Sequence, residues 1–215
     1  MENTTPFGLY YIDREYIEAM HAADRHIPNA DYEDSGRARK FYCGPVMNQD
    51  GVNYYVPVSH EQKSMEIIGS RRNGFPEYFG LNMRDQNNEK AGSLDFRYMI
   101  PCVDERFLET IDPNQDLGKY GKGQAHFCQK YERTICNSAR NAYENIQSCE
   151  YPMLKDSSID FENAITAAWE HLDKVEEREN NKEKKAKIAA RSASADSMTA
   201  NISTTEFSET FSKNN

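Results

Sequence analysis

The chain has 215 residues, a formal net charge of −9 and a hydrophobic content of 38%. This length predicts one domain, and the acidic balance counts against a protein that binds nucleic acid over its whole surface. The sequence contains no run of 18 apolar residues and no signal-peptide layout, so we expect a soluble, cytoplasmic protein with no membrane segment. Five cysteines without CxxC spacing predict reduced thiols (Cys43, Cys102, Cys128, Cys136 and Cys149).

The first half of the chain predicts strands around one helix. Residues 7–12 form an aromatic and β-branched run, and Asp13 is placed to cap a helix that ends near Asp24. Two further β-type runs flank Asp50-Gly51, a dipeptide that tolerates the positive φ angles of a tight turn. Residues 40–60 therefore read as a β-hairpin.

The second half is mainly helical in its patterning. Residues 94–101 predict a strand, whereas apolar stripes predict helices over 125–146 and 161–175. Strands followed by helices, without βα alternation, indicate an α+β fold around an antiparallel sheet. We expect Trp169 to pack on the core within its stripe. Beyond residue 176 few large apolar groups remain, which predicts a solvated helix end and a disordered tail over 176–215 after a single domain over 1–175.

The hairpin concentrates groups that can act on a phosphodiester. Its second strand ends in Ser59-His60, with Lys63 three residues later, and Lys40 opens the first strand. A hairpin returns the chain to its start, so we expect Lys40 near the same end. Proton transfer and anion stabilisation, which these side chains supply, are what phosphodiester cleavage requires. The alternative is a polar strand end that only turns the chain.

Other chemistries have weaker support in the sequence. The five histidines are dispersed without HxH, HExxH or paired Cys/His spacing, so we expect neither a metal nor another cofactor. No GxSxG motif surrounds a serine, and no cysteine adjoins a histidine in sequence, although pairing in space stays open.

Two segments are basic despite the acidic total. Residues 37–84 hold seven basic and four acidic side chains, and residues 117–140 hold five basic and one acidic. These segments predict phosphate contacts, with solvated surface as the alternative. The candidate RNA-binding residues are Arg37, Arg39, Arg71, Arg72, Lys119, Lys122 and Lys130, together with Tyr32, Tyr54 and Tyr55 as aromatic side chains that could stack a base.

Several of these segments, in this order, resemble the ToxN/AbiQ family of type III toxin–antitoxin endoribonucleases. The matching pieces are Leu9-Tyr10-Tyr11-Ile12, Lys40-Phe41-Tyr42-Cys43-Gly44, Tyr54 to Ser59, Leu94 to Pro101, and the helix around Gln129-Lys130-Tyr131. The resemblance covers residues 8 to about 150. It implies a strongly twisted antiparallel sheet similar to that of the MazF/Kid toxins.

The resemblance also implies a function. It implies metal-independent RNA cleavage to a 2′,3′-cyclic phosphate and a 5′-hydroxyl, and inhibition by an RNA pseudoknot cut from a tandem-repeat transcript. It further implies a closed assembly of several protein and RNA subunits. Ser59, Lys40 and Lys63 map onto the family's strand-end motif, but His60 stands where a second hydroxyl is usual and Lys63 comes one residue late. Gly36 replaces a family tyrosine, and Tyr32 is the nearest substitute.

The residues suggest how such a site would work. His60 can exchange a proton near neutral pH, Lys40 and Lys63 can stabilise the phosphate charge, and Ser59 can donate a hydrogen bond. The competing interpretation is a catalytically inactive RNA-binding or protein-interaction module on the same fold.

Overall fold

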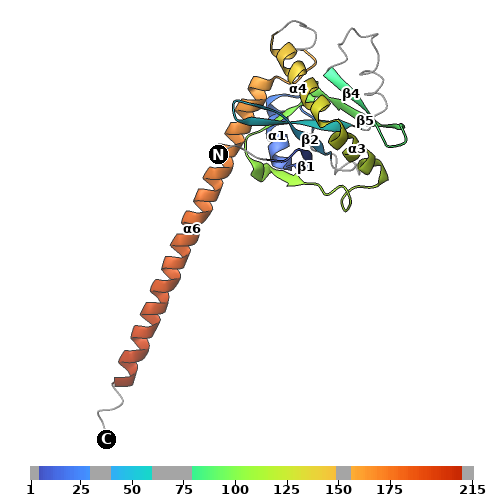
Figure 1. Ribbon diagram of the computed structural model, residues 1–215. Helices are drawn as coiled ribbons and strands as arrows, with labels where there is room; N and C mark the ends of the chain where they lie inside the picture. Colours follow the sequence, from blue (N-terminus) through green and yellow to red (C-terminus); the bar gives the residue numbers. More distant parts are fainter. Residues whose placement is uncertain (1–4, 30–39, 60–78, 149–155, 210–215) are drawn as a thin grey trace. The chain divides into compact units, whose positions relative to one another are not determined.

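A seven-stranded antiparallel sheet forms the centre of the protein, seen here in a computed structural model (Figure 1). The structure describes residues 5–29, 40–59, 79–148 and 156–209. The strands run in the order β4-β5-β3-β2-β1-β7, and β6 also pairs with β3. Their bounds are β1 Gly8–Ile12, β2 Tyr42–Gln49, β3 Val52–Ser59, β4 Gly80–Arg84, β5 Lys90–Asp95, β6 Ile100–Cys102 and β7 Leu108–Thr110.

Four α-helices accompany the sheet in the described part of the chain. They are α1 Arg14–Ala23, α3 Lys119–Lys130, α4 Glu132–Gln147 and α6 Phe161–Glu209. Helix α3 packs against β4 and β5, and α4 packs against β2 (Figure 1). The chain divides into two compact units, Met1–His171 and Leu172–Asn215. The first unit has the predicted α+β class.

Two predicted local structures are confirmed. The Asp13 side chain accepts a hydrogen bond from the Tyr16 backbone N–H at 3.0 Å and so caps α1. Asp50 and Gly51 have φ angles of 52° and 84°, the paired positive values of a two-residue turn that suits the strand twist. The hairpin of β2 and β3 therefore forms where the sequence predicts it.

The single strand predicted over 94–101 is wrong in extent. Strand β5 ends at Asp95, a 3₁₀ turn η3 covers Phe96–Tyr98, and β6 then begins. The cause is Asp95, whose carboxylate accepts hydrogen bonds from the Arg97 backbone N–H at 3.2 Å and from its guanidinium. This local bonding competes with the sheet and breaks the run into two strands.

Other boundaries also differ from the prediction. The helix expected over 125–146 is two helices, because the chain leaves helical geometry at Tyr131, with φ −112° and ψ 20°. Strands β4 and β7 carry no apolar alternation strong enough to predict them. In the sheet they are stabilised by pairing with β5 and β1.

Aromatic rings dominate the core around β3. Five of these side chains are at most 2% exposed: Tyr16, Tyr54, Tyr55, Phe96 and Phe161. Tyr54 lies edge-on to Phe161 with ring centroids 5.9 Å apart, and Tyr55 contacts Tyr10 at 5.5 Å. Burying side chains of this size supplies much of the apolar stabilisation of the sheet.

The last helix differs from the prediction in two ways. Trp169 is 46% exposed, because the buried face of α6 in the first unit runs through Phe161, Ala164 and Ala168, about 100° from it. The segment expected to be a disordered tail is helical to Glu209. Its Lys, Glu and Ala residues favour a helix without a core, and Glu183 pairs with Lys187 at 2.6 Å.

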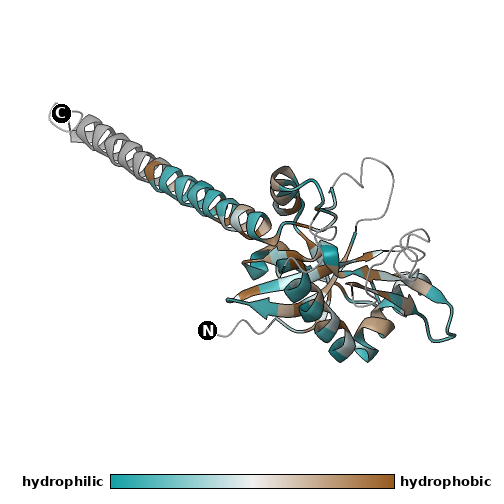
Figure 2. Ribbon diagram, turned by 90° about the horizontal axis from the view of Figure 1, so that it is seen from above, coloured by the Kyte–Doolittle hydropathy of each residue, from teal (hydrophilic) through white to brown (hydrophobic). Residues whose placement is uncertain are grey.

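Beyond residue 172, the side chains of α6 described up to residue 188 are mostly exposed and polar (Figure 2). None of the helices that the structure describes is both long and apolar enough to cross a membrane.

Candidate functional site

The end of β3 brings together two of the predicted catalytic residues, Lys40 and Ser59. Tyr42 pairs with Pro57, and the Val58 backbone N–H donates to the Phe41 carbonyl at 3.0 Å. Continuing this antiparallel register by one residue places Lys40 across from Ser59. Both side chains are partly exposed, so both can reach a ligand at this end of the hairpin.

The opposite edge of β3 adds two polar residues. Ser59 pairs with Ser93 of β5, and Ser93 pairs in turn with Asn82 of β4. Residues that lie directly opposite each other in an antiparallel sheet share a face. Ser59, Ser93 and Asn82 therefore form a polar row across three neighbouring strands, and Lys40, two residues before β2, extends it. The row offers an ammonium group, two hydroxyls and an amide on one face.

Apolar neighbours hold this polar row in place. Val58 and Leu94 pair with each other next to it and are 2% and 0% exposed. Ser93 is itself fully buried, whereas Asn82 is exposed. The row is thus partly exposed at Lys40 and Ser59, buried at Ser93 and exposed again at Asn82.

Several predicted site residues lie outside the described residues. They are the predicted proton carrier, the second predicted catalytic lysine and five of the predicted RNA contacts. These residues are His60, Lys63, Arg71, Arg72, Tyr32, Arg37 and Arg39.

Two predicted base-stacking residues are corrected by the structure. Tyr54 and Tyr55 are both 0% exposed: Tyr143 and Phe161 pack against the Tyr54 ring, and Tyr10 packs against the Tyr55 ring. Burial raises the pKa of both phenols above the ordinary value, so both remain neutral. With no exposed surface, neither ring can stack on an RNA base, and both are core residues.

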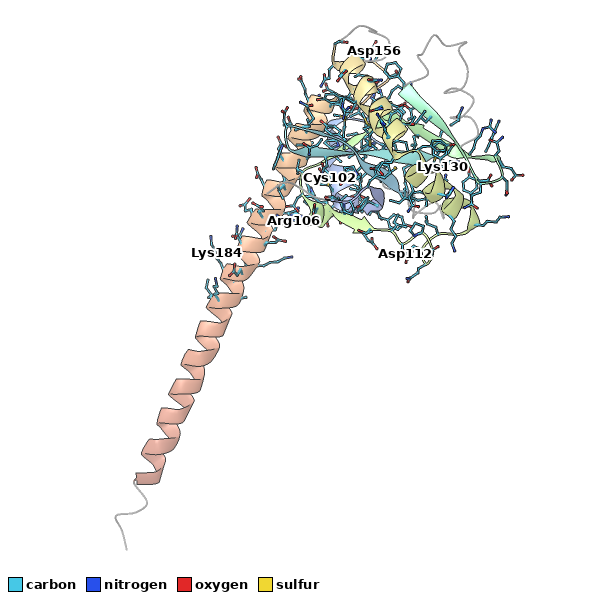
Figure 3. The ribbon with its side chains drawn as sticks, viewed as in Figure 1. Cys102, Arg106, Asp112, Lys130, Asp156 and Lys184 are labelled. Atoms are coloured by element: carbon cyan, nitrogen blue, oxygen red, sulfur yellow. The ribbon has the colours of Figure 1, made fainter. Side chains whose placement is uncertain are left out.

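Helix α3 carries the three predicted lysines that the structure describes. Lys119, Lys122 and Lys130 are all exposed, and Figure 3 shows Lys130 on this helix. Two exposed aromatic residues accompany them: Tyr120 is 45% and Tyr131 is 39% exposed. The Lys130 ammonium lies 5.3 Å from the Tyr131 ring centroid. These tyrosines were missed because their positions in the sequence carry no signal of exposure.

The cysteines have the properties of core residues. Cys43, Cys102 and Cys128 are buried. Burial raises the pKa of Cys102 to about 12 and raises that of Cys43 as well, so these two thiols stay protonated near neutral pH and are poor nucleophiles. Among the described residues, no three His, Cys, Asp or Glu side chains gather closely enough to hold a metal ion.

The fold is shared with proteins of known structure. Three solved structures share the fold at 17–19% sequence identity. One is AbiQ, described as a lactococcal anti-phage endoribonuclease of the type III toxin–antitoxin system, with TM-score 0.65 and 17% identity. It is matched over 99% of its length and 79% of this chain.

The second structure comes from work on selective toxin inhibition by a non-coding RNA pseudoknot. It has TM-score 0.60 and 19% identity to this chain. The match covers 98% of its own length and 78% of this chain. The third, from work on a processed non-coding RNA that regulates a bacterial antiviral system, has TM-score 0.60 and 17% identity. This match covers 95% of the neighbour's length and 74% of this chain. The matches therefore show that this chain has the same α+β fold as these structures.

The chain belongs to the ToxN toxin family of type III toxin–antitoxin systems, whose family model matches residues 8–168. The family named from the sequence is thus confirmed. No curated protein sequence matches the chain. The family match ends inside α6, so most of that helix lies beyond it.

Proposed function

We propose that this chain is an endoribonuclease toxin that cuts RNA without a metal ion and is inhibited by an RNA antitoxin. The observation that carries the proposal is the register of the hairpin, which brings Lys40 and Ser59 together at the strand end of a ToxN-family chain. The description of AbiQ as an endoribonuclease supports the activity, and the pseudoknot that inhibits a structural neighbour supports an RNA inhibitor.

The proposed reaction uses the RNA's own 2′-hydroxyl. Its oxygen attacks the adjacent phosphorus and loses a proton to a base, while the bond from phosphorus to the 5′-oxygen breaks and that oxygen gains a proton. The products are a 2′,3′-cyclic phosphate and a 5′-hydroxyl. A protein catalysing this step must move two protons and stabilise the added negative charge on the phosphate.

The polar row supplies the electrostatic part of this reaction. The Lys40 ammonium stabilises the phosphate oxygens in the transition state, and the Ser59 hydroxyl donates a hydrogen bond to one of them. We assign proton exchange to His60, the residue after Ser59, and additional charge stabilisation to Lys63, four residues after Ser59.

The exposed face of α3 supports RNA binding next to this site. Helix α3 packs on β4 and β5, the strands that carry the outer half of the polar row. Its lysines at 119, 122 and 130 can contact phosphates, and Tyr120 and Tyr131 can take the base-stacking role first assigned to Tyr54 and Tyr55. Tyr32, Arg37, Arg39, Arg71 and Arg72 remain predicted RNA contacts.

The finer expectations belong to the same proposal. The toxin works in the cytoplasm, as a single catalytic domain over residues 1–175, and its antitoxin is cut from tandem repeats. The complex with that RNA is a closed assembly of several subunits. The likeness to the MazF/Kid toxins also remains a prediction.

Cleavage by purified protein tests the proposal. A structured RNA is incubated with the protein in excess EDTA, and the new ends are identified chemically. We expect cyclic phosphate and 5′-hydroxyl ends. Loss of cleavage on chelation, with recovery on adding Mg²⁺ or Mn²⁺, would overturn the metal-independent mechanism. Tight RNA binding without cleavage would favour the inactive module instead.

Expression in cells tests the antitoxin. The gene alone should arrest growth. We expect short tandem repeats just upstream of it, and their co-expression should restore growth. Arrest that persists with the repeats present would count against an RNA inhibitor encoded there.

A further inference from the structure

Ser93 has the properties of a functional rather than a packing residue. Its side chain is 0% exposed, and within the described part of the chain its hydroxyl oxygen has no hydrogen-bond partner. A buried hydroxyl without a partner is unfavourable, because water no longer solvates it. Alanine or valine would fill a sheet position at lower cost. The hydroxyl therefore calls for an explanation.

The position of Ser93 in the sheet provides one. Ser93 lies directly across from Ser59 in the β3–β5 pair. Side chains in this relation have Cβ atoms about 4.5–5.5 Å apart, and paired Ser or Thr residues can hydrogen-bond to each other. The two hydroxyls are not hydrogen-bonded to each other in this structure, because that of Ser93 has no partner among the described residues. A hydroxyl both donates and accepts, so a change of the Ser59 rotamer would let Ser93 accept from Ser59 or donate to it.

The backbone of β5 next to Ser93 also packs tightly against β3 and α3. Gly92 has a φ of 135°, and a Cβ atom placed on it would lie 2.4 Å from the Ser59 carbonyl oxygen and 2.6 Å from the Gln124 Nε2 atom. Only glycine allows three groups to approach so closely. Gln124 belongs to α3 and is 0% exposed. The end of β3, the start of β5 and a buried amide from α3 therefore converge behind Ser59.

We propose that Ser93 is a positioning residue that orients the Ser59 hydroxyl toward the scissile phosphate, while Gln124 and Gly92 fix the strand end that carries Ser59. This inference rests on the proposed function of Ser59. Rotation of the Ser59 hydroxyl away from the phosphate would misdirect its hydrogen bond, and a misplacement of about 1 Å can lower a rate by about 100-fold. Substrate binding, which depends on charged surface groups, would change little.

A double-mutant cycle on the full-length protein tests this role. Ser93→Ala should lower kcat about 10- to 100-fold with KM within about twofold, because the effect is on orientation. In the Ser59→Ala background the same change should have no further effect, since the hydroxyl to be oriented is gone. Gln124→Met should lower kcat in the same way.

Ser158→Ala is the matched control for a purely structural effect. Ser158 is 1% exposed and its hydroxyl also has no partner among the described residues, but it lies just before α6 and outside the polar row. We expect its kcat to equal that of the wild type. If Ser93→Ala also leaves kcat unchanged, or lowers it equally in the Ser59→Ala background, the positioning role is wrong.

A second measurement separates this inference from the proposed function. Amide hydrogen exchange reports the Val58 N–H, which donates to the Phe41 carbonyl at the strand end. Gln124→Met should speed its exchange and Ser158→Ala should not. If the wild type fails to cleave RNA, the proposed function and the catalytic role of Ser93 both fail. Faster exchange of the Val58 N–H in Gln124→Met would then still show that Gln124 holds the end of β3 in place. Unchanged exchange would overturn that role.

Discussion

The two halves of β3 differ in burial and in the kind of side chain that they carry. Its first half carries Tyr54 and Tyr55, which are fully buried among aromatic rings between β2 and β6. Its last residue, Ser59, is partly exposed and lies in a polar row with Lys40, Ser93 and Asn82. The anchored half of the strand therefore leads directly into the half that carries the proposed active site. Changes at the first end should affect stability, and changes at the second should affect activity.

Removing the ring of Tyr54 should have the largest effect on stability. Tyr54→Ala leaves a cavity against Tyr143 and Phe161, and should lower the free energy of unfolding by about 3–5 kcal/mol. Tyr54→Phe keeps the ring and serves as the control. Denaturant melts measure both variants. Equal stability of Tyr54→Ala and the wild type would contradict the anchoring role of this half of β3.

Asp24 offers a comparison with a polar cluster that has a structural role. It is 9% exposed and accepts hydrogen bonds from the backbone N–H groups of His26 at 2.8 Å and Asp160 at 2.7 Å. Burial alone would raise the pKa of this carboxyl, but the hydrogen bonds from His26 and Asp160 outweigh it, and the pKa lies below its ordinary value. Asp24→Asn should therefore cost about 1–3 kcal/mol of stability with cleavage unchanged.

The sign of the pH dependence follows from the lowered pKa. The folded protein holds the Asp24 carboxyl ionised more readily than the unfolded chain, so its contribution is complete above the ordinary pKa of about 4. The contribution is lost as the pH falls through the lower folded value. The stability difference between wild type and Asp24→Asn should thus shrink in acid melts. A difference that stays constant would show that ionisation of Asp24 is not involved.

Trp169 sharpens the contrast between buried and exposed aromatic residues. It is 46% exposed, so Trp169→Ala should cost only about 1 kcal/mol or less, well below the cost for a buried ring. Phe161→Ala, eight residues earlier on the same helix and at a side chain only 2% exposed, should cost about 3–5 kcal/mol. Thermal melts of the two variants compare them directly. Equal losses would contradict the observed orientation of α6.

Deletion from Asn181 should have the smallest effect. The family match ends at residue 168, and the described side chains from residue 176 to 188 are almost all exposed. The truncated protein should keep its melting temperature and its cleavage rate. Its helical circular dichroism should fall, because α6 continues to Glu209. A large drop in melting temperature would show that this part of α6 stabilises the rest of the chain.

Local patterns explain most of what could be predicted from the sequence. The Asp13 cap, the Asp50-Gly51 turn and the hairpin depend on neighbouring residues, and they form as expected. The break at Asp95 and the exposure of Trp169 depend on hydrogen bonding and on the angle at which a helix meets its core. An apolar stripe alone does not determine either of them.

Only the part of the candidate site that lies within the hairpin could be predicted from the sequence. Lys40 and Ser59 belong to one hairpin, so their proximity follows from a local turn. Ser93 and Asn82 join them through the pairing of β5 with β3 and β4, a non-local arrangement that no nearby residue signals. Gln124 comes from a helix still further along the chain. The supporting half of the site therefore becomes visible only in the folded sheet.

The most direct test of the site is the cleavage rate of Ser59→Ala, measured beside its thermal melt. Loss of one hydrogen-bond donor to a phosphate transition state should lower kcat by about 10²–10³-fold, and a partly exposed serine should change stability by less than about 0.5 kcal/mol. A folded Ser59→Ala protein that cuts RNA as fast as the wild type would contradict the assignment of the active site to the end of β3.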